Sequence, residues 1–222
     1  MKPLLTSTHD YAKHYEDLGF ALVAIPAGSK APTSFGWQTK ATPPDFWRDN
    51  PSHNIGLLHS LSGTVALDID HMANTRTIFD ALNIDLSAIL DNAPRICGRP
   101  DRGKALFRAP TNSQLTTRKI SWPIEADPRK TEVVFELRAG TVQDVLPPSI
   151  HPDTGNPYTW DGNDILDGIP EIPEQLLIIW EQWDKFRPQL MDACPWKRAP
   201  EFKPPPKPRR MESKGQSVIG AY

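Results

Sequence analysis

Residues 64–70, TVALDID, form an apolar run that ends on two aspartates separated by one residue. Such a run of apolar and β-branched residues predicts a buried strand. Because side chains alternate between the two faces of a strand, Asp68 and Asp70 point the same way and Ile69 points the other way. Two adjacent carboxylates repel each other unless a cation lies between them, and hard oxygen ligands suit Mg²⁺ or Mn²⁺. The pair alone is equally consistent with aspartates that are exposed or paired with arginine.

The segments on both sides of this strand predict a mixture of helices and strands. Helices are expected over 8–18, 43–51, 74–90 and 173–186. Strands are expected over 20–26, 54–60, 63–70, 131–140 and 142–150, with two more inside 93–110 joined by a polar loop. Residues 60–63, SLSG, have the composition of a turn between two of these strands.

A third acid lies in one of the predicted strands. Glu136 stands in the otherwise apolar segment VVFELR, residues 133–138. An acid among Val and Phe needs a partner, which is either a cation or an arginine. Glu136 is therefore the best candidate for a third carboxylate beside Asp68 and Asp70.

Two further segments carry groups that suit a nucleotide. Residues 98–108, GRPDRGKALFR, place basic side chains around Gly103, and Arg and Lys recognise phosphate; the simpler interpretation is a polar hairpin tip. Residues 146–160, LPPSIHPDTGNPYTW, hold Ser149 and His151 on a rigid proline-framed segment, and no nearby aspartate suggests a hydrolase triad.

Composition sets the outer bounds. The chain has 222 residues, 38% of them hydrophobic, with a formal net charge of −2. Cys97 and Cys194 are too few for a disulfide framework or a cysteine-rich zinc site. No secretory signal or membrane-spanning stretch is evident, so we expect a cytoplasmic protein that does not enter a membrane. Residues 95–138 carry ten basic and five acidic side chains, which predicts either a solvated charged face or a groove for a polyanion.

The C-terminal part differs in character from the rest. Residues 197–222 are basic and rich in proline, with little apolar content. We expect a globular domain over 1–190 and an extended linker over 191–222. The final residues, SVIGAY, are apolar again, and they predict a further domain beyond the linker.

Four blocks in order resemble the bifunctional primase-polymerase domains of phage and plasmid replication proteins, in the archaeo-eukaryotic primase superfamily. The blocks are GFALVAIPAGSKAPTSFGWQ, NIGLLHSLSGTVALDID, GRPDRGKALFRAP and VFELRAGTVQDVLPPSIHPDTGNPYTW. The resemblance spans residues 10–185, and SGTVALDID and LPPSIHPDTGNPYTW are its most specific parts. It implies an α+β fold in which an RRM-like antiparallel sheet carries the acidic site and an N-terminal α/β module accompanies it.

The resemblance also implies roles for individual residues. The family's first motif is a pair of acids, matched by Asp68 and Asp70, and its third is one acid, matched by Glu136. These three would be both catalytic and metal-binding, at a site for two Mg²⁺ or Mn²⁺ ions. The second motif has a histidine where this chain has Lys104. The nucleotide-binding residues implied are Lys30, Arg102, Lys104, Ser149 and His151.

In this family the reaction is metal-dependent nucleotidyl transfer by a DNA primase/DNA polymerase. The implied partners are a single-stranded DNA template, NTP or dNTP substrates, and a C-terminal helicase-like domain in the full-length protein. We expect the domain to be a monomer in the cytoplasm of a bacterial host. If Lys104 replaces the motif histidine, its ammonium should face the acids across a gap the size of a triphosphate.

Three other interpretations remain open at this stage. A non-catalytic module for single-stranded or origin DNA could keep the same fold, and the lysine at position 104 motivates that alternative. A metal-dependent nuclease could use the same acids, but Arg138 stands where a lysine is expected after Glu136. A sugar-nucleotide transferase could use an Asp-x-Asp pair, but nothing else in the sequence supports it.

Overall fold

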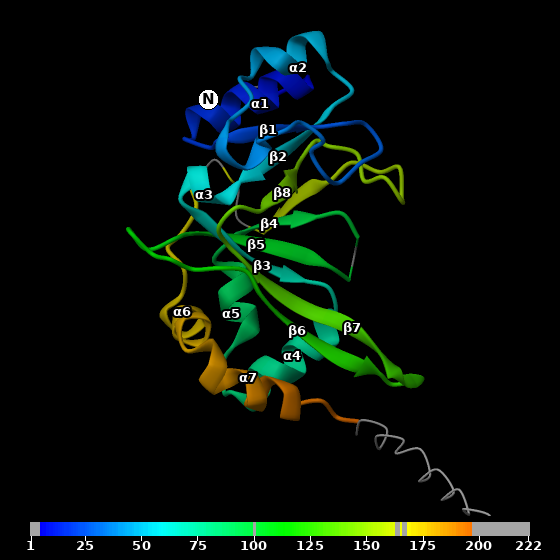
Figure 1. Ribbon diagram of the computed structural model, residues 1–222, viewed down its shortest axis with the longest axis vertical. Helices are drawn as coiled ribbons and strands as arrows, with labels where there is room; N and C mark the ends of the chain where they lie inside the picture. The colour runs from blue at the N-terminus through cyan, green and yellow to red at the C-terminus, as the bar shows by residue number, and fades with distance from the viewer. Residues whose placement is uncertain (1–4, 100, 163–164, 166–167, 197–222) are drawn as a thin grey trace, which may run out of the picture.

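The computed structural model describes residues 5–99, 101–162, 165 and 168–196, which form two antiparallel sheets with helices packed against them (Figure 1). The helices are α1 (Thr8–Asp17), α2 (Asp45–Asp49), α3 (His59–Ser62), α4 (Met72–Ala81), α5 (Leu86–Asp91), α6 (Glu174–Glu181) and α7 (Trp183–Asp192), with a 3₁₀ turn at Trp37–Thr39. The strands are β1 (Leu22–Ile25), β2 (Asn54–Leu58), β3 (Thr64–Ile69), β4 (Pro94–Cys97), β5 (Gly103–Arg108), β6 (Arg118–Ile124), β7 (Asp127–Arg138), β8 (Gln143–Leu146) and β9 (Thr159–Gly162). None of the helices in the described ranges is long and apolar enough to cross a membrane.

The two sheets differ in size and in the parts of the chain that build them. The small sheet has the order β1-β2-β8, and the large sheet has the order β6-β7-β3-β5-β4-β9. Every neighbouring pair of strands is antiparallel, which confirms the predicted α+β class. β8 comes from the C-terminal half of the chain but completes the N-terminal sheet, so it ties the two sheets together.

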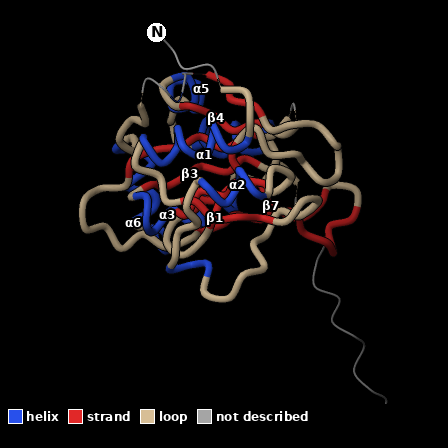
Figure 2. The backbone as a smooth tube through the Cα atoms, turned by 90° about the horizontal axis from the view of Figure 1, so that it is seen from above, coloured by secondary structure: helices blue, strands red, loops and turns tan. Residues whose placement is uncertain are grey.

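The core consists of two apolar layers on opposite faces of the large sheet. Val65, Leu67 and Ile69 of β3 pack with residues of α4–α7 in one layer. Ala66 of β3 belongs to the other layer, which includes Tyr15 of α1 and residues of the small sheet. The view in Figure 2 shows α1 and α2 lying over the strands. Asp68 lies on the same face of β3 as Ala66, because side chains alternate along a strand. This face is turned away from α4–α7.

Three predictions of local structure were wrong. The helix predicted over 74–90 is two helices, because Asn83 takes a left-handed conformation (φ 57°) between α4 and α5. The helix predicted over 173–186 is divided at Gln182, where the backbone leaves the helical region (φ −99°, ψ 34°). Residues 60–63 are not a hairpin turn: the single turn α3 takes the chain from the small sheet to the large one, and Gly63 (φ 61°) ends it.

The structure contains two strands that we had not predicted from the sequence. β6 begins with two charged residues and contains Pro123, and proline is tolerated there because β6 is an edge strand. β9 forms the opposite edge, where Asp161 pairs with Arg95 at 2.7 Å. β6 does carry an alternating apolar pattern at Ile120, Trp122 and Ile124, whereas the short β9 has none and depends on pairing with β4.

The C-terminal end of the described residues still packs on the domain. α7 continues through Asp192, and the Trp196 indole donates a hydrogen bond to the Pro123 carbonyl at 2.7 Å. The predicted linker over 191–222 therefore begins with residues that contact the large sheet. Residues 197–222 of that linker lie outside the described part of the chain.

Candidate active site

The register of the large sheet decides which side chains accompany the two aspartates. Asp68 lies opposite Lys104 of β5 on one side and opposite Glu136 of β7 on the other. Lys119 of β6 in turn lies opposite Glu136. Side chains of directly paired residues project from the same face of a sheet. Four adjacent strands thus present a row in which two acids, Glu136 and Asp68, lie between two lysines, Lys119 and Lys104, and Asp70 follows on the same face.

Each acid in this row contacts a basic side chain. The Lys104 ammonium lies 2.8 Å from Asp68, and the Arg138 guanidinium lies 2.8 Å from Glu136. Asp70 accepts a hydrogen bond from Arg102 at 2.9 Å. Arg138 also lies 3.9 Å from Asp68, so it reaches two of the three predicted metal ligands.

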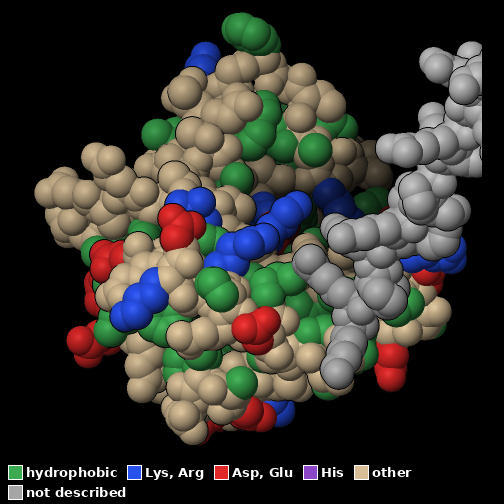
Figure 3. All heavy atoms as spheres, turned by 60° about the horizontal axis from the view of Figure 1, so that its bottom comes forward, with side chains coloured by type: hydrophobic (Ala, Val, Ile, Leu, Met, Phe, Trp, Pro, Cys, Tyr) green, Lys and Arg blue, Asp and Glu red, His purple; other side chains and the backbone are tan. Residues whose placement is uncertain are grey.

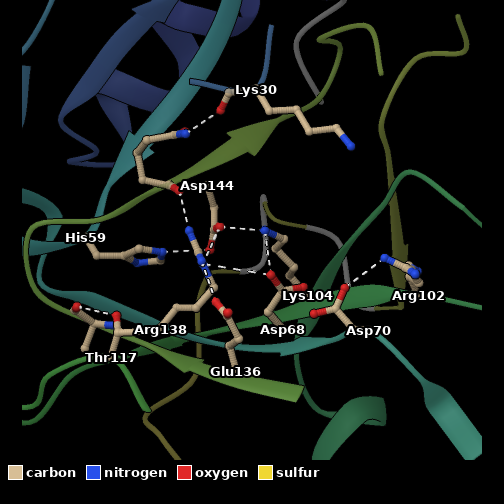
Figure 4. A network of polar contacts seen from close by, with 12 residues as sticks. Lys30, His59, Asp68, Asp70, Arg102, Lys104, Thr117, Glu136, Arg138 and Asp144 are labelled. Carbon is tan, nitrogen blue, oxygen red and sulfur yellow. Dashed lines mark hydrogen bonds and ion pairs between the residues drawn. The ribbon is translucent and has the colours of Figure 1, made fainter. Parts of the chain in front are cut away.

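Asp144 of β8 is a fourth acid, and we had not predicted it from the sequence. Its side chain is fully buried, and it lies 2.7 Å from both Lys104 and Arg138 and 2.8 Å from His59 (Figure 4). The second nitrogen of His59 contacts the Thr64 hydroxyl at 2.9 Å. Asp144 stands in the short apolar segment VQDVL, so the argument that led to Glu136 could have found it.

Burial raises the pKa values of the buried acids in this site, and the nearby cations lower them. Burial raises the pKa of Asp68 above its usual range, although Lys104 opposes this effect. Burial would also raise the pKa of Asp144, but Lys104 and Arg138 outweigh it and hold that pKa well below its usual range. Burial lowers the pKa of Lys104, yet Asp144 and Asp68 overcome it and the net shift is upward. Asp144 and Lys104 are therefore charged at neutral pH.

A pocket of about 220 Å³ opens beside this row. It is lined by two acids, four basic side chains, His151 and smaller or apolar groups: Lys30, Asp68, Asp70, Ile96, Gly98, Arg99, Arg102, Gly103, Lys104, His151 and Tyr158. Basic side chains recognise phosphate and carboxylates bind hard cations, so this mixed lining suits a ligand that carries phosphates and a bound cation.

The His151 and Tyr158 rings can lie against Gly98 of the pocket lining only because this residue has no side chain. A Cβ atom at Gly98 would lie 2.6 Å from the Tyr158 ring and 2.9 Å from the His151 ring. The two rings are 5.2 Å apart between centroids and tilted by 38°. Burial, with Lys30 and Arg99 nearby, lowers the pKa of His151, so the imidazole ring is neutral at pH 7 and presents a flat surface.

The structure brings most of the predicted site residues to this pocket. Lys30, Arg102, Lys104 and His151 line it together with the two aspartates. Glu136 is not among the lining residues, but it shares their face of the sheet.

Ser149 lies elsewhere. It is buried, and its hydroxyl accepts a hydrogen bond from the Ile55 amide at 2.8 Å. In this structure it joins the proline segment to β2 and does not line the pocket.

The expected gap between Lys104 and the acids is not present. The ammonium contacts Asp68 directly, because the two residues are direct cross-strand partners. Lys104 therefore lies between the Asp68 and Asp144 carboxylates, in contact with both, and not across the pocket from the acids.

The donor chemistry of the site fits a divalent cation, although the side chains as placed contact bases. Asp68, Asp70 and Glu136 supply carboxylate oxygens from one face of the sheet, the ligand type that Mg²⁺ and Mn²⁺ prefer. Among the described residues, no group of three or more His, Cys, Asp or Glu side chains has the arrangement of a metal site. To bind a metal ion, the carboxylates must exchange contacts with Lys104, Arg138 and Arg102 for contacts with the ion.

The two sheets define an α+β protein, and its pocket is lined by both acidic and basic side chains. Residues 12–175 match the family model of the bifunctional DNA primase/polymerase, N-terminal domain. This range is most of the chain, so the protein belongs to the Prim-Pol family, which confirms the resemblance seen in the four sequence blocks. A search of curated proteins finds no match.

Proposed function

We propose that this domain is a DNA primase/polymerase that transfers nucleotides in a metal-dependent reaction on a single-stranded DNA template. The observation that carries the proposal is the placement of Asp68, Asp70 and Glu136 on one face of the sheet, beside a pocket that four basic side chains line. The membership in the Prim-Pol family supports the same reaction class.

In this proposal Asp68, Asp70 and Glu136 hold two Mg²⁺ or Mn²⁺ ions. When bound, such ions lower the pKa of an attacking hydroxyl and neutralise the charge that develops on the leaving pyrophosphate. Asp68 and Glu136 are held by paired strands, and Asp70 directly follows the end of β3. Rigid elements of this kind hold catalytic groups with small positional error.

The incoming NTP or dNTP would occupy the pocket. Arg102 and Lys30 stand at its rim with partly exposed side chains, so they can turn toward the β- and γ-phosphates. Lys104, which lines the pocket beside Asp68, would supply a further positive charge to the phosphates. The Tyr158 and His151 rings offer flat surfaces for the base or sugar. Ser149 would not contact the nucleotide directly, because its hydroxyl accepts a hydrogen bond from β2.

The template would run over the β6–β7 side of the same face. Lys119 is exposed and lies directly opposite Glu136, so it continues the row of site residues outward. Arg129 and Lys130, near the start of β7, are also exposed. Figure 3 shows Lys and Arg side chains gathered toward the middle of the face that it presents. Contacts of this kind to the phosphate backbone bind DNA without reading its sequence.

The wider setting is inferred from the family. We propose that the large sheet is the RRM-like sheet of the superfamily and that a C-terminal helicase-like domain accompanies this domain in the full-length protein. A phage or plasmid origin, a bacterial cytoplasm and a monomeric domain belong to the same proposal. The family match supports these inferences only through the resemblance to replication proteins.

Primer synthesis and primer extension on single-stranded DNA test the proposal. Reactions with NTPs or dNTPs and with Mg²⁺ or Mn²⁺ should yield extended products, and Asp68→Ala combined with Asp70→Ala should abolish them while the circular dichroism spectrum is retained. Asp161→Asn, which breaks an exposed ion pair with Arg95 on the same sheet, is the matched control. No incorporation by the wild-type protein under any of these conditions would refute the proposed activity.

A second candidate function is a non-catalytic module that binds DNA or nucleotides. It is favoured by one observation: all three candidate metal ligands contact basic side chains. This alternative predicts template binding that is unaffected by Mg²⁺ or Mn²⁺, with no incorporation. Primer extension distinguishes the two functions directly.

A further inference from the structure

Asp144 differs from the other acids of the site in its surroundings. It is the only Asp or Glu among the fully buried residues of the described ranges. It comes from β8 of the small sheet, whereas Asp68 and Glu136 come from the large sheet. A carboxylate is costly to bury unless charged or hydrogen-bonding partners surround it, so the partners of Asp144 indicate what keeps it there.

Both oxygens of Asp144 are already used by side chains. Oδ1 lies 2.7 Å from the Lys104 ammonium and 2.7 Å from Nε of Arg138, and Oδ2 lies 2.8 Å from Nε2 of His59. Arg138 also donates to the carbonyl of Gln143, the preceding residue of β8, at 2.7 Å. β8 therefore contacts both basic side chains, and Asp144 is not among the residues that line the pocket.

The charges around the site show why such an anchor matters. Asp68, Asp70 and Glu136 contact three cations, Lys104, Arg102 and Arg138. Three acids neutralised by three bases offer no net charge to a divalent cation. Asp144 adds one negative charge beside two of those bases, and opposite charges this close interact strongly in a buried setting.

We propose that Asp144 is a positioning residue that draws Lys104 and Arg138 toward β8 and so leaves Asp68 and Glu136 available to a divalent cation. This inference rests on the proposed function, because it assigns Asp68 and Glu136 as metal ligands. His59 supports the arrangement from the other side: its ring is fixed between Asp144 and Thr64, so the Asp144 carboxylate cannot rotate away from the two cations without losing a contact.

Mn²⁺ binding measured by calorimetry, without nucleotide or DNA, tests this role. In Asp144→Asn, Lys104 and Arg138 lose their shared counter-charge and should turn fully onto Asp68 and Glu136. We expect Mn²⁺ to bind about tenfold more weakly or worse. The double variant Asp144→Asn with Lys104→Met removes one cation and one anion, so it should restore Mn²⁺ affinity to within about threefold of the wild type.

Two further variants complete the experiment. Asp161→Asn removes one acid from an exposed ion pair on the same sheet, and it should leave Mn²⁺ affinity within about twofold of the wild type. Lys104→Met alone should bind Mn²⁺ about threefold more tightly or better, because a competitor for Asp68 has been removed. This second variant keeps the test valid if Asp144→Asn does not fold.

The outcomes separate this inference from the proposed function. Weak binding in Asp144→Asn with rescue in the double variant supports the positioning role, even if the wild type incorporates no nucleotide. Wild-type affinity in Asp144→Asn, failure of the double variant to recover, or weaker binding in Lys104→Met overturns the role, even if the protein is an active polymerase. A wild type that binds no Mn²⁺ also overturns it.

Discussion

Arg102 offers the sharpest test of how the pocket binds a triphosphate. Its side chain is 47% exposed at the pocket rim, and in this structure it contacts Asp70 at 2.9 Å. Both Asp70 and the nucleotide phosphates would compete for its guanidinium. Arg102→Ala should therefore change the affinities for nucleotide and for metal in opposite directions.

The size of the effect follows from the two contacts. A charge-assisted hydrogen bond contributes roughly 1.5–3 kcal/mol. To reach a phosphate, Arg102 must give up its pair with Asp70, and a pair that is this exposed is worth roughly 0–1 kcal/mol. The difference is about 0.5–3 kcal/mol, which corresponds to about two- to 160-fold weaker nucleotide binding in Arg102→Ala. Mn²⁺ alone should bind as well as in the wild type or a few-fold more tightly, because Asp70 has lost a competitor.

Titration of a triphosphate in the presence of Mn²⁺, and of Mn²⁺ alone, measures both affinities. Arg129→Ala is the matched control, because Arg129 is also paired with an aspartate, Asp127 at 2.9 Å, but lies on the β6–β7 hairpin away from the pocket. It should change neither affinity. Nucleotide affinity in Arg102→Ala equal to that of Arg129→Ala would refute the assignment of Arg102 to the phosphates.

Three other predictions concern stability and the shape of the pocket. Tyr15→Phe should lower the free energy of unfolding by about 2–3 kcal/mol in urea denaturation, because the buried hydroxyl donates to a loop carbonyl at 2.7 Å and accepts from Trp160 at 2.9 Å. The pKa of Asp144 is held well below its usual range, so its stabilisation is present above the unfolded-state pKa, about 3.9, and is lost as the pH falls through the lower folded-state pKa. Asp144→Asn should thus cost most stability near neutral pH and progressively less in acid, as denaturation across this pH range would show. Gly98→Ala should weaken nucleotide binding in a fluorescence titration, because its Cβ would press on the Tyr158 ring; unchanged affinity would mean that the nucleotide does not reach that side of the pocket.

The individual segments of the site could be predicted, because a few consecutive residues determine the local structure of each. The alternation in TVALDID places Asp68 and Asp70 on one face, and the same reasoning applied to VVFELR identifies Glu136. The basic loop before Lys104 forms the predicted turn between paired strands β4 and β5. In each segment, a charged residue in an apolar strand or a glycine in a polar loop provides the signal.

The relations between these segments could not be predicted in the same way. Lys104 contacts Asp68 because the β3–β5 register makes them direct partners, and nothing in either segment specifies that register. Asp144 meets Lys104 only because the chain leaves the large sheet after β7, and the next strand, β8, pairs with β2 in the small sheet. The helix break at Asn83 does have a local signal, because asparagine tolerates the left-handed conformation and Asp85 caps the next helix; the break at Gln182 has no such signal in its neighbours.

The proline segment shows how a strong sequence motif can serve the site indirectly. Ser149 bonds to the Ile55 amide at 2.8 Å, the Ile150 amide donates to Asn54 at 2.8 Å, and Tyr15 donates to the Pro147 carbonyl at 2.7 Å. These contacts fix the chain where it leaves β8, in register with β2. Since β8 carries Asp144, the same contacts fix the position of that carboxylate relative to the large sheet. The segment therefore acts on the site from both ends, because it holds Asp144 in place on one side and delivers His151 to the pocket on the other.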